Sequence, residues 1–297
     1  MSDPIWLEEI KLPFYLSYSQ LDMFLKCPRQ YQENYRQAQR PKRTTNIKAI
    51  LGSSVHKALE CFYDGIKANF GKPSHDVNAL IEIFGQEMWR LIQNATADNS
   101  MIYFSLANKV HTKEDYERVS KKDQLAAYET GVKCLSLAYK DWYAQDHEWE
   151  PVEAEMVIDG PLKDVQDYPG INDTNFKIII DKVDRHKKTG AYRVVDHKTA
   201  AEFDKELIHD SLQLTLYAYA ASKALGVNIQ HVSYNVFTTS GSPSHNWLHG
   251  SRDKKAFDKM LEDLNYIIPA IKLGYWYRTP SEKGCKYCML RDTCRRT

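Results

Sequence analysis

Two aspartates and a lysine near the middle of the chain could carry out metal-assisted hydrolysis. Asp196 and Lys198 are two residues apart in an apolar segment, so on a strand their side chains point to the same side. Asp181 ends the apolar run of residues 176–181 upstream. If the two strands pair antiparallel, both carboxylates can approach one hard divalent cation, and Lys198 can bind a phosphate or a water. Such a cation activates water and stabilises a phosphoryl transition state.

An Asp-x-Lys tripeptide alone is weak evidence, because it occurs by chance on many exposed strands. The segment that follows strengthens it. Gln213 and Tyr217 are four residues apart in a helical pattern, so they share one face of that helix. The sequence thus predicts a strand that ends in Asp181, then a strand with Asp196 and Lys198, and then a helix with two polar residues on one face.

Cysteines form a second group of residues that could do chemistry. Three of the six lie within ten residues near the C-terminus, spaced Cys285-x2-Cys288-x5-Cys294. Either Zn²⁺ or an iron–sulfur cluster can use this spacing, and Cys27 supplies a fourth thiolate if the chain ends meet. The other two, Cys61 and Cys134, fall in helical patterns and are interpreted as small apolar residues of the core.

Hydrophobic periodicity predicts the elements that must position these residues. Helices are expected at residues 17–38 (two short ones that meet at Cys27, with Ser19 as N-cap), 50–62, most of 76–145 with a connection inside 94–122, 211–225 and 257–273. Strands are expected at residues 152–158, 176–183, 192–196 and 232–238, the second and third joined by a turn at 186–190. The burial that the three isoleucines at 178–180 imply favours a central strand of the sheet.

Composition excludes some classes of protein. The chain is 43% hydrophobic and 27% charged with a formal charge of +1, which is typical of a folded domain and does not indicate a strongly basic nucleic-acid binder. No apolar run approaches the ~18 residues of a membrane-spanning helix, and no basic segment followed by an apolar one opens the chain. We therefore expect a cytoplasmic protein, in a bacterial or phage-infected cell, with no membrane partner.

The ordered motifs resemble the PD-(D/E)XK nuclease superfamily, in particular its RecB-like branch, which includes CRISPR-associated iron–sulfur exonucleases and phage relatives. Residues 18–31 resemble the opening motif, and residues 52–56 resemble the motif that ends in the active-site histidine, His56. The nuclease motifs of the family are matched by Asp181 and by residues 196–198. The helix that follows these motifs is matched by the one bearing Gln213 and Tyr217. One departure is Ile178, where the family often has glycine.

The resemblance implies a metal site. His56, Asp181 and Asp196, together with the backbone carbonyl of His197, would bind Mg²⁺ or Mn²⁺. From the residues alone, His56 would be interpreted as a buried core histidine.

The resemblance also implies roles for the neighbouring side chains. Lys198 would orient the attacking water and offset charge at the scissile phosphate, while Gln213 and Tyr217 would position the nucleic-acid backbone or the lysine. An acidic residue on the preceding strand usually joins such a site; Glu153 and Glu155 both qualify, and we favour Glu155.

For the cysteines, the resemblance implies a [4Fe-4S] cluster held by Cys27, Cys285, Cys288 and Cys294, with zinc as the alternative. The cluster would be structural and would tie the two chain ends together.

The expected fold is therefore α/β: a restriction-endonuclease-like core with a central mixed sheet flanked by helices, a helical insertion, and a four-cysteine cluster domain formed by both chain ends. Four parts are expected, namely a helical segment with one cluster cysteine (1–50), a helical lobe bearing His56 (51–150), the nuclease core (151–245), and a helix with the cysteine tail (246–297).

The expected function is a stand-alone, metal-dependent DNA exonuclease that acts on single strands or DNA ends in recombination, repair or phage DNA processing. Since no Gly-x4-Gly-Lys-Ser/Thr loop is present, unwinding would need a separate helicase, and a recombinase or single-strand-binding protein is a further expected partner. Two alternatives stay open: a non-cleaving nucleic-acid-binding iron–sulfur scaffold, and a nuclease that trims DNA during CRISPR adaptation.

Overall fold

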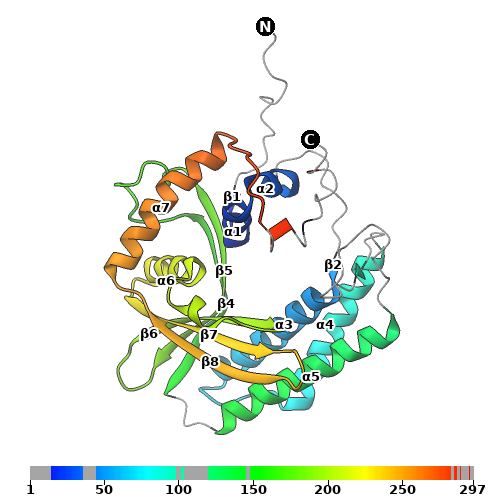
Figure 1. Cartoon of the computed structure of the whole chain (residues 1–297). Helices are drawn as coiled ribbons and strands as arrows, with labels where there is room; N and C mark the ends of the chain where they lie inside the picture. The colour runs from blue at the N-terminus through cyan, green and yellow to red at the C-terminus, as the bar shows by residue number, and fades with distance from the viewer. Residues whose placement is uncertain are drawn as a thin grey trace. The chain divides into compact units, whose positions relative to one another are not determined.

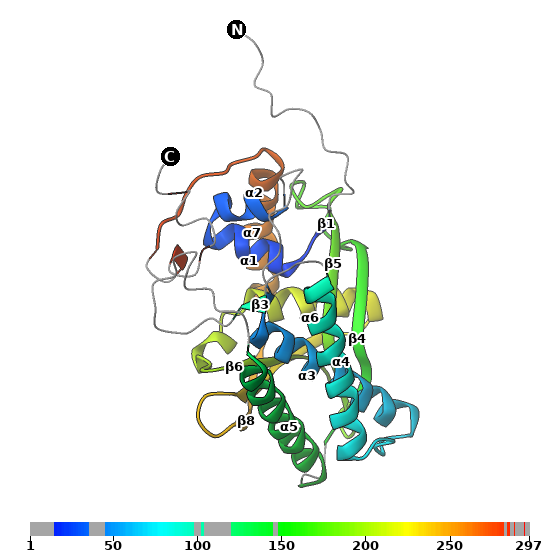
Figure 2. The ribbon, with the colours of Figure 1, turned by 90° about the vertical axis from the view of Figure 1, so that its right-hand side faces the viewer.

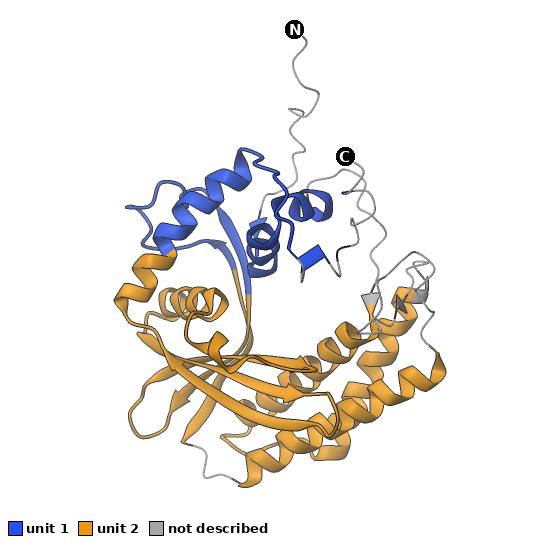
Figure 3. Ribbon diagram, viewed as in Figure 1, with its two compact units in different colours: residues 1–41, 159–178, 261–297 blue, residues 42–158, 179–260 orange. Residues whose placement is uncertain are grey.

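The structure is a computed structural model that describes residues 15–35, 45–97, 102–103, 120–144, 148–281, 284–285, 288 and 294. The chain forms two compact units (Figure 3). The end unit comprises residues 1–41, 159–178 and 261–297, and the central unit comprises residues 42–158 and 179–260.

Most of the expected elements are present, and Figure 1 labels them. The helices are α1 (Tyr18–Lys26), α2 (Pro28–Tyr35), α3 (Ile47–Ala68), α4 (Val77–Ala97), α5 (Lys121–Ala144), the short 3-10 helix η3 (Lys205–Ile208), α6 (Leu212–Leu225) and α7 (Lys254–Lys272). The strands are β1 (Tyr15–Leu16), β2 (Thr45–Asn46), β3 (Ile102–Tyr103), β4 (Trp149–Pro161), β5 (Asn175–His186), β6 (Tyr192–Ala200), β7 (Ile229–Thr238) and β8 (Ser244–Ser251).

A mixed sheet forms the middle of the central unit. β5 and β6 pair antiparallel, with Lys182 opposite Val195, as the short turn between them requires. β6 pairs parallel with β7, since α6 lies between them in the sequence as a crossover, and β7 pairs antiparallel with β8. The expected α/β fold with a mixed central sheet flanked by helices is confirmed.

Helices cover both faces of this sheet. α6 contacts β6 and β7, whereas α3 contacts β6 and α5 contacts β8 (Figure 1). Successive β6 side chains alternate between these two layers. Figure 2 shows α3, α4 and α5 packed into one helical layer. Apolar residues from these three helices form its core, among them Val55, Leu59, Phe62, Phe84 and Leu135.

In the end unit, the C-terminal segment packs on the N-terminal helices. The Arg29 N–H donates to the Tyr277 carbonyl at 3.1 Å, and the Trp276 ring stacks on Tyr31 with centroids 5.7 Å apart. β1 pairs parallel with the start of β5, Leu16 opposite Phe176. Segments from both ends of the chain therefore meet in this unit.

One expected N-cap was wrong, and one strand was not expected. The N-cap of α1 is Ser17, not Ser19, and its hydroxyl accepts from the Gln20 N–H. β5 is a central strand as expected, because it pairs with β6 and with β1 and β4, although Ile179 is 41% exposed. β8 was not expected, since it lacks β-branched residues; its pairing with β7 overrides that low propensity.

Two further expectations stay predictions. The expected connection inside residues 94–122 lies mostly outside the described residues. The four-part division of the chain also stays a prediction. Within the described part of the chain, none of the helices is both long and apolar enough to cross a membrane.

Candidate active site

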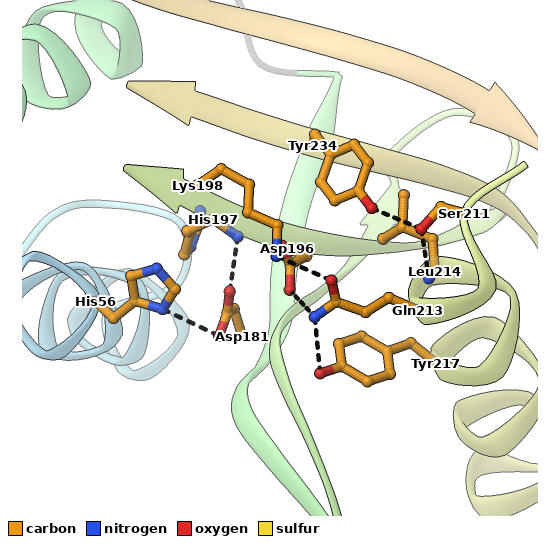
Figure 4. A network of polar contacts seen from close by, with 10 residues as sticks. All are labelled: His56, Asp181, Asp196, His197, Lys198, Ser211, Gln213, Leu214, Tyr217 and Tyr234. Atoms are coloured by element: carbon orange, nitrogen blue, oxygen red, sulfur yellow. Dashed lines mark hydrogen bonds and ion pairs between the residues drawn. The ribbon is translucent and has the colours of Figure 1, made fainter. Parts of the chain in front are cut away.

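The central unit brings together six side chains singled out from the sequence (Figure 4). They come from four elements: His56 from α3, Asp181 from β5, Asp196 and Lys198 from β6, and Gln213 and Tyr217 from α6. Antiparallel pairing of β5 with β6 brings Asp181 beside residues 196 and 197, and α6 packs directly on β6.

Asp181 is held from two sides. Its Oδ1 lies 3.3 Å from His56 Nδ1, and its Oδ2 accepts a hydrogen bond from the His197 backbone N–H at 2.6 Å. Burial raises the pKa of Asp181, but the charge of His56 and these hydrogen bonds outweigh burial and lower it to about 2. Burial lowers the pKa of His56, and Asp181 more than offsets this and raises it. This carboxylate thus stays ionised and stabilises a neighbouring positive charge.

Asp196 has the opposite electrostatic character. Burial raises its pKa to about 6, with Lys198 opposing the rise and the charge of Asp181 adding to it. Its Oδ1 accepts from Gln213 Nε2 at 2.6 Å, and its Oδ2 forms an ion pair with Lys198 Nζ at 2.7 Å. That Oδ2 is nevertheless buried without a hydrogen bond of acceptable geometry to any described residue. A buried carboxylate beside a half-buried one therefore calls for additional positive charge.

Lys198 is oriented by its neighbours. Its Nζ donates to Gln213 Oε1 at 2.9 Å, and Gln213 Nε2 also donates to the Tyr217 hydroxyl at 3.0 Å. Burial lowers the pKa of Lys198, but the Asp196 charge outweighs burial and raises it. The ammonium group is therefore charged and is held within reach of both carboxylates.

Sequence analysis missed one residue next to the Asp-x-Lys motif, Tyr234. Tyr234 lies opposite Asp196 in the β6–β7 register, and the Lys198 ammonium lies 5.5 Å from its ring centroid. Its hydroxyl bonds Ser211, the N-cap of α6, at 2.6 Å. No local pattern indicated Tyr234, because its position depends on a parallel strand register.

Glu155 is the better of the two acidic candidates on β4. Burial raises its pKa, as do Glu60 and, to a smaller extent, Asp181. Glu153 instead pairs with Lys67 at 2.6 Å on the surface. Glu60 was also missed, although it follows His56 by four residues on α3 and so shares its helix face.

The donor atoms of the site suit a divalent cation. Among the described residues, no group of three or more histidine, cysteine or acidic side chains is arranged to hold a metal ion. The chemistry nevertheless fits, since carboxylates and an imidazole are ligands for Mg²⁺ or Mn²⁺. Asp196 Oδ2 is buried and forms no hydrogen bond to a described residue beside its ion pair with Lys198.

The four cysteines expected to hold a cluster all belong to the end unit. Cys27 lies between α1 and α2, and Cys285 Sγ accepts from the Ser281 N–H at 3.4 Å. The part of the chain that the structure describes does not gather these thiols into a metal site, so the cluster stays a prediction. Cys134 is fully buried, and burial raises the pKa of its thiol to about 11, as for a core residue; Cys61 is only partly buried.

Comparisons with known proteins identify the family and the fold. A family model described as the PD-(D/E)XK nuclease superfamily, whose members typically use divalent metals, matches residues 15–295. The fold is similar to the crystal structure of a Eubacterium rectale protein named "putative exonuclease", with a TM-score of 0.51 and 12% identity over 99% of this chain and 92% of that one. A search of curated protein sequences finds no match.

Proposed function

Because the chain belongs to the PD-(D/E)XK nuclease superfamily, we propose that it is a metal-dependent deoxyribonuclease that degrades single-stranded DNA or DNA ends as an exonuclease. One observation carries the proposal. Asp181, Asp196 and Lys198 converge from two paired strands, with Gln213 bonded to both residues of the Asp-x-Lys motif. A protein that only bound nucleic acid would have no need to bury Asp196 beside a second carboxylate at such a cost.

His56, Asp181 and Asp196 would hold Mg²⁺ or Mn²⁺, with the His197 carbonyl as a further ligand. When bound, such a cation lowers the pKa of a water and stabilises the charge of the phosphoryl transition state. Lys198 then orients the water and binds a phosphate oxygen, because Asp196 and Gln213 keep its ammonium charged and in place. Water attacks phosphorus as the bond to the leaving oxygen breaks, and that oxygen takes up a proton.

Neighbouring residues would complete the site. Gln213 sets the orientation of Asp196 and Lys198, and Tyr217 supports Gln213. Glu155 would add negative charge beside Asp181, which favours the binding of a cation.

We further propose a [4Fe-4S] cluster on Cys27, Cys285, Cys288 and Cys294. Packing within the end unit supports it, because the Arg29–Tyr277 hydrogen bond and the Trp276–Tyr31 stack bring the start of the cysteine tail against the helices that flank Cys27. The cellular role would be recombination, repair or phage DNA processing, together with a separate helicase.

The test is a cleavage assay with Mg²⁺ or Mn²⁺ on end-labelled single-stranded, double-stranded and closed circular DNA. Lys198→Ala should lose about 100-fold or more of the activity, while Lys67→Ala, which removes an exposed lysine of the same unit, should retain it. Equal activity in Lys198→Ala would refute the site. Cleavage of closed circles would refute the purely exonucleolytic mode, and DNA binding without cleavage in the wild type would indicate a scaffold.

A further inference from the structure

A second polar network lies behind the candidate site, on the other face of β6. His197 stands between Asp196 and Lys198, so its side chain points away from theirs. Its Nδ1 lies 3.0 Å from Asn235 Nδ2, and Asn235 Oδ1 accepts a hydrogen bond from His245 Nε2. The catalytic strand is thereby tied to β7 and β8.

The network continues into the helical layer. His245 Nδ1 lies 4.0 Å from Asp141 Oδ2 on α5, and that oxygen accepts a hydrogen bond from Trp247 Nε1 at 3.0 Å. The His245 ring also stacks on Phe237, with centroids 4.6 Å apart and planes inclined by 8°. His245 is therefore fixed by packing and by its hydrogen bond to Asn235.

His197 connects this network to the site through its backbone and its ring. Its backbone N–H donates to Asp181 at 2.6 Å. Its ring stacks on Tyr63 at 5.6 Å and meets the edge of His56 at 5.8 Å. His56 and Tyr63 are seven residues apart on α3, so one ring maintains the spacing between that helix and β6.

Asn235 fixes the His197 ring from the far side. The two residues are directly opposite in the parallel β6–β7 register, and Asn235 is 0% exposed and His197 2% exposed. A buried amide that loses its partners is destabilising, so the two contacts of Asn235, to His197 and to His245, favour one orientation of its side chain. Asn235 on β7 therefore holds the ring of His197, and the backbone N–H of the same His197 positions Asp181.

We infer that Asn235 is a positioning residue of the active site: through His197 it fixes the segment of β6 that holds Asp181 and from which Asp196 and Lys198 project. This inference rests on the proposed nuclease function and adds to it a residue behind the sheet. Groups that orient the residues around a metal site influence metal affinity strongly even without touching the ion.

Ser233 provides a matched control on the same strand. It precedes Asn235 by two residues, so it points to the same face of β7, and it is 1% exposed. Its hydroxyl bonds His249 Nδ1 on β8 at 2.9 Å, so its hydrogen bond leads to the edge strand instead of to β6. Ser233→Ala therefore removes a buried polar contact between the strands without altering the support of His197.

The experiment is a calorimetric Mn²⁺ titration of the full-length protein without DNA. Asn235→Leu, which keeps the side-chain size and removes both hydrogen bonds, should bind Mn²⁺ about 10–100-fold more weakly, while Ser233→Ala should bind like the wild type despite a lower Tm. In cleavage assays at saturating Mn²⁺, Asn235→Leu should lower kcat more than it raises KM for DNA. Should Asn235→Leu fail to fold, Asn235→Ser replaces it.

Wild-type Mn²⁺ affinity in a folded Asn235 variant would overturn the inference, as would an equal loss in Ser233→Ala. Asp181→Asn separates this outcome from failure of the proposed function. If the wild type binds Mn²⁺ and Asp181→Asn binds it equally well, the metal site itself is wrong. If Asp181→Asn abolishes binding and Asn235→Leu leaves it unchanged, only the role of Asn235 is wrong.

Discussion

At the scale of single residues, two neighbouring carboxylates are given different properties by their surroundings. Asp181 has His56, whose pKa it raises, and a backbone N–H as partners, so the pKa of Asp181 falls to about 2. Asp196 is more deeply buried and faces the charge of Asp181, so its pKa rises to about 6 in spite of Lys198. Ionising both side chains is costly without a cation, which is the electrostatic basis for metal binding here.

Gln213 is the residue whose loss should affect the motif most. Its amide donates to Asp196 at 2.6 Å and accepts from Lys198 at 2.9 Å, whereas Tyr217 contacts the motif through the hydrogen bond that it accepts from Gln213. We expect Gln213→Leu to lower kcat about 10–100-fold, as measured by steady-state cleavage. The reduction in kcat caused by Tyr217→Phe should be several times smaller than the reduction caused by Gln213→Leu. A Tyr217→Phe loss as large as that of Gln213→Leu would show that the hydroxyl contacts DNA directly.

At the scale of secondary-structure elements, the helical layer depends on a close approach of α4 and α5. Gly131 on α5 faces Phe84 on α4, and a Cβ added at Gly131 would lie 2.1 Å from Phe84 Cζ. Phe84 is fully buried and cannot move aside easily. Glycine at this position therefore permits the packing, although it lowers helix propensity.

Alanine at this glycine should destabilise the protein. Gly131→Ala gains about 1 kcal/mol of helix propensity but costs about 1–3 kcal/mol through overpacking, so the free energy of unfolding should fall. Gly85→Ala on α4 is the control, because its Cβ would meet only the Tyr128 ring at 3.3 Å. Urea denaturation of both variants compares them, and a Gly131→Ala protein more stable than Gly85→Ala would contradict the close packing.

β8 should contribute to the acid sensitivity of the fold. Burial lowers the pKa of His249, and the charge of Arg193 lowers it further. The unfolded chain therefore binds protons more readily, so the stability that neutral His249 contributes is present above about pH 6.5 and is lost as the pH falls through its lower folded pKa.

His249→Phe tests this pH dependence. The free energy of unfolding of the wild type, measured by urea denaturation from about pH 7.5 to 5, should fall more steeply than that of His249→Phe. Ser233→Ala removes the hydrogen-bond partner of His249 but keeps the imidazole, so its pH dependence should follow the wild type. Parallel curves for wild type and His249→Phe would refute the prediction.

At the scale of the whole molecule, segments from both ends of the sequence belong to one compact unit, the end unit. Residues 1–41 share this unit with residues 159–178 and 261–297. A cluster that joins Cys27 to the tail would close a very long loop and stabilise the folded state by restricting the unfolded chain.

The proposed cluster makes a prediction that distinguishes the cysteines. Anaerobically purified protein should be brown, with broad absorption near roughly 400 nm, and Cys288→Ser should lose this absorption and lower the Tm. Cys134→Ser alters a core cysteine and should keep the absorption. A colourless preparation with one bound zinc would show that the four cysteines hold zinc and not an iron–sulfur cluster. A wild-type protein that contains neither metal would refute the four-cysteine site.

The sequence by itself determined which residues could act and which elements carry them. Alternation along a strand placed Asp196 and Lys198 on one side, and helical spacing joined Gln213 to Tyr217, because both patterns arise from local backbone geometry. Only the tertiary structure decided that Tyr234 lies beside Asp196, that Asn235 supports His197, and that β8 is a strand. Those positions follow from the register between strands distant in sequence, which depends on long-range packing instead of on local propensity.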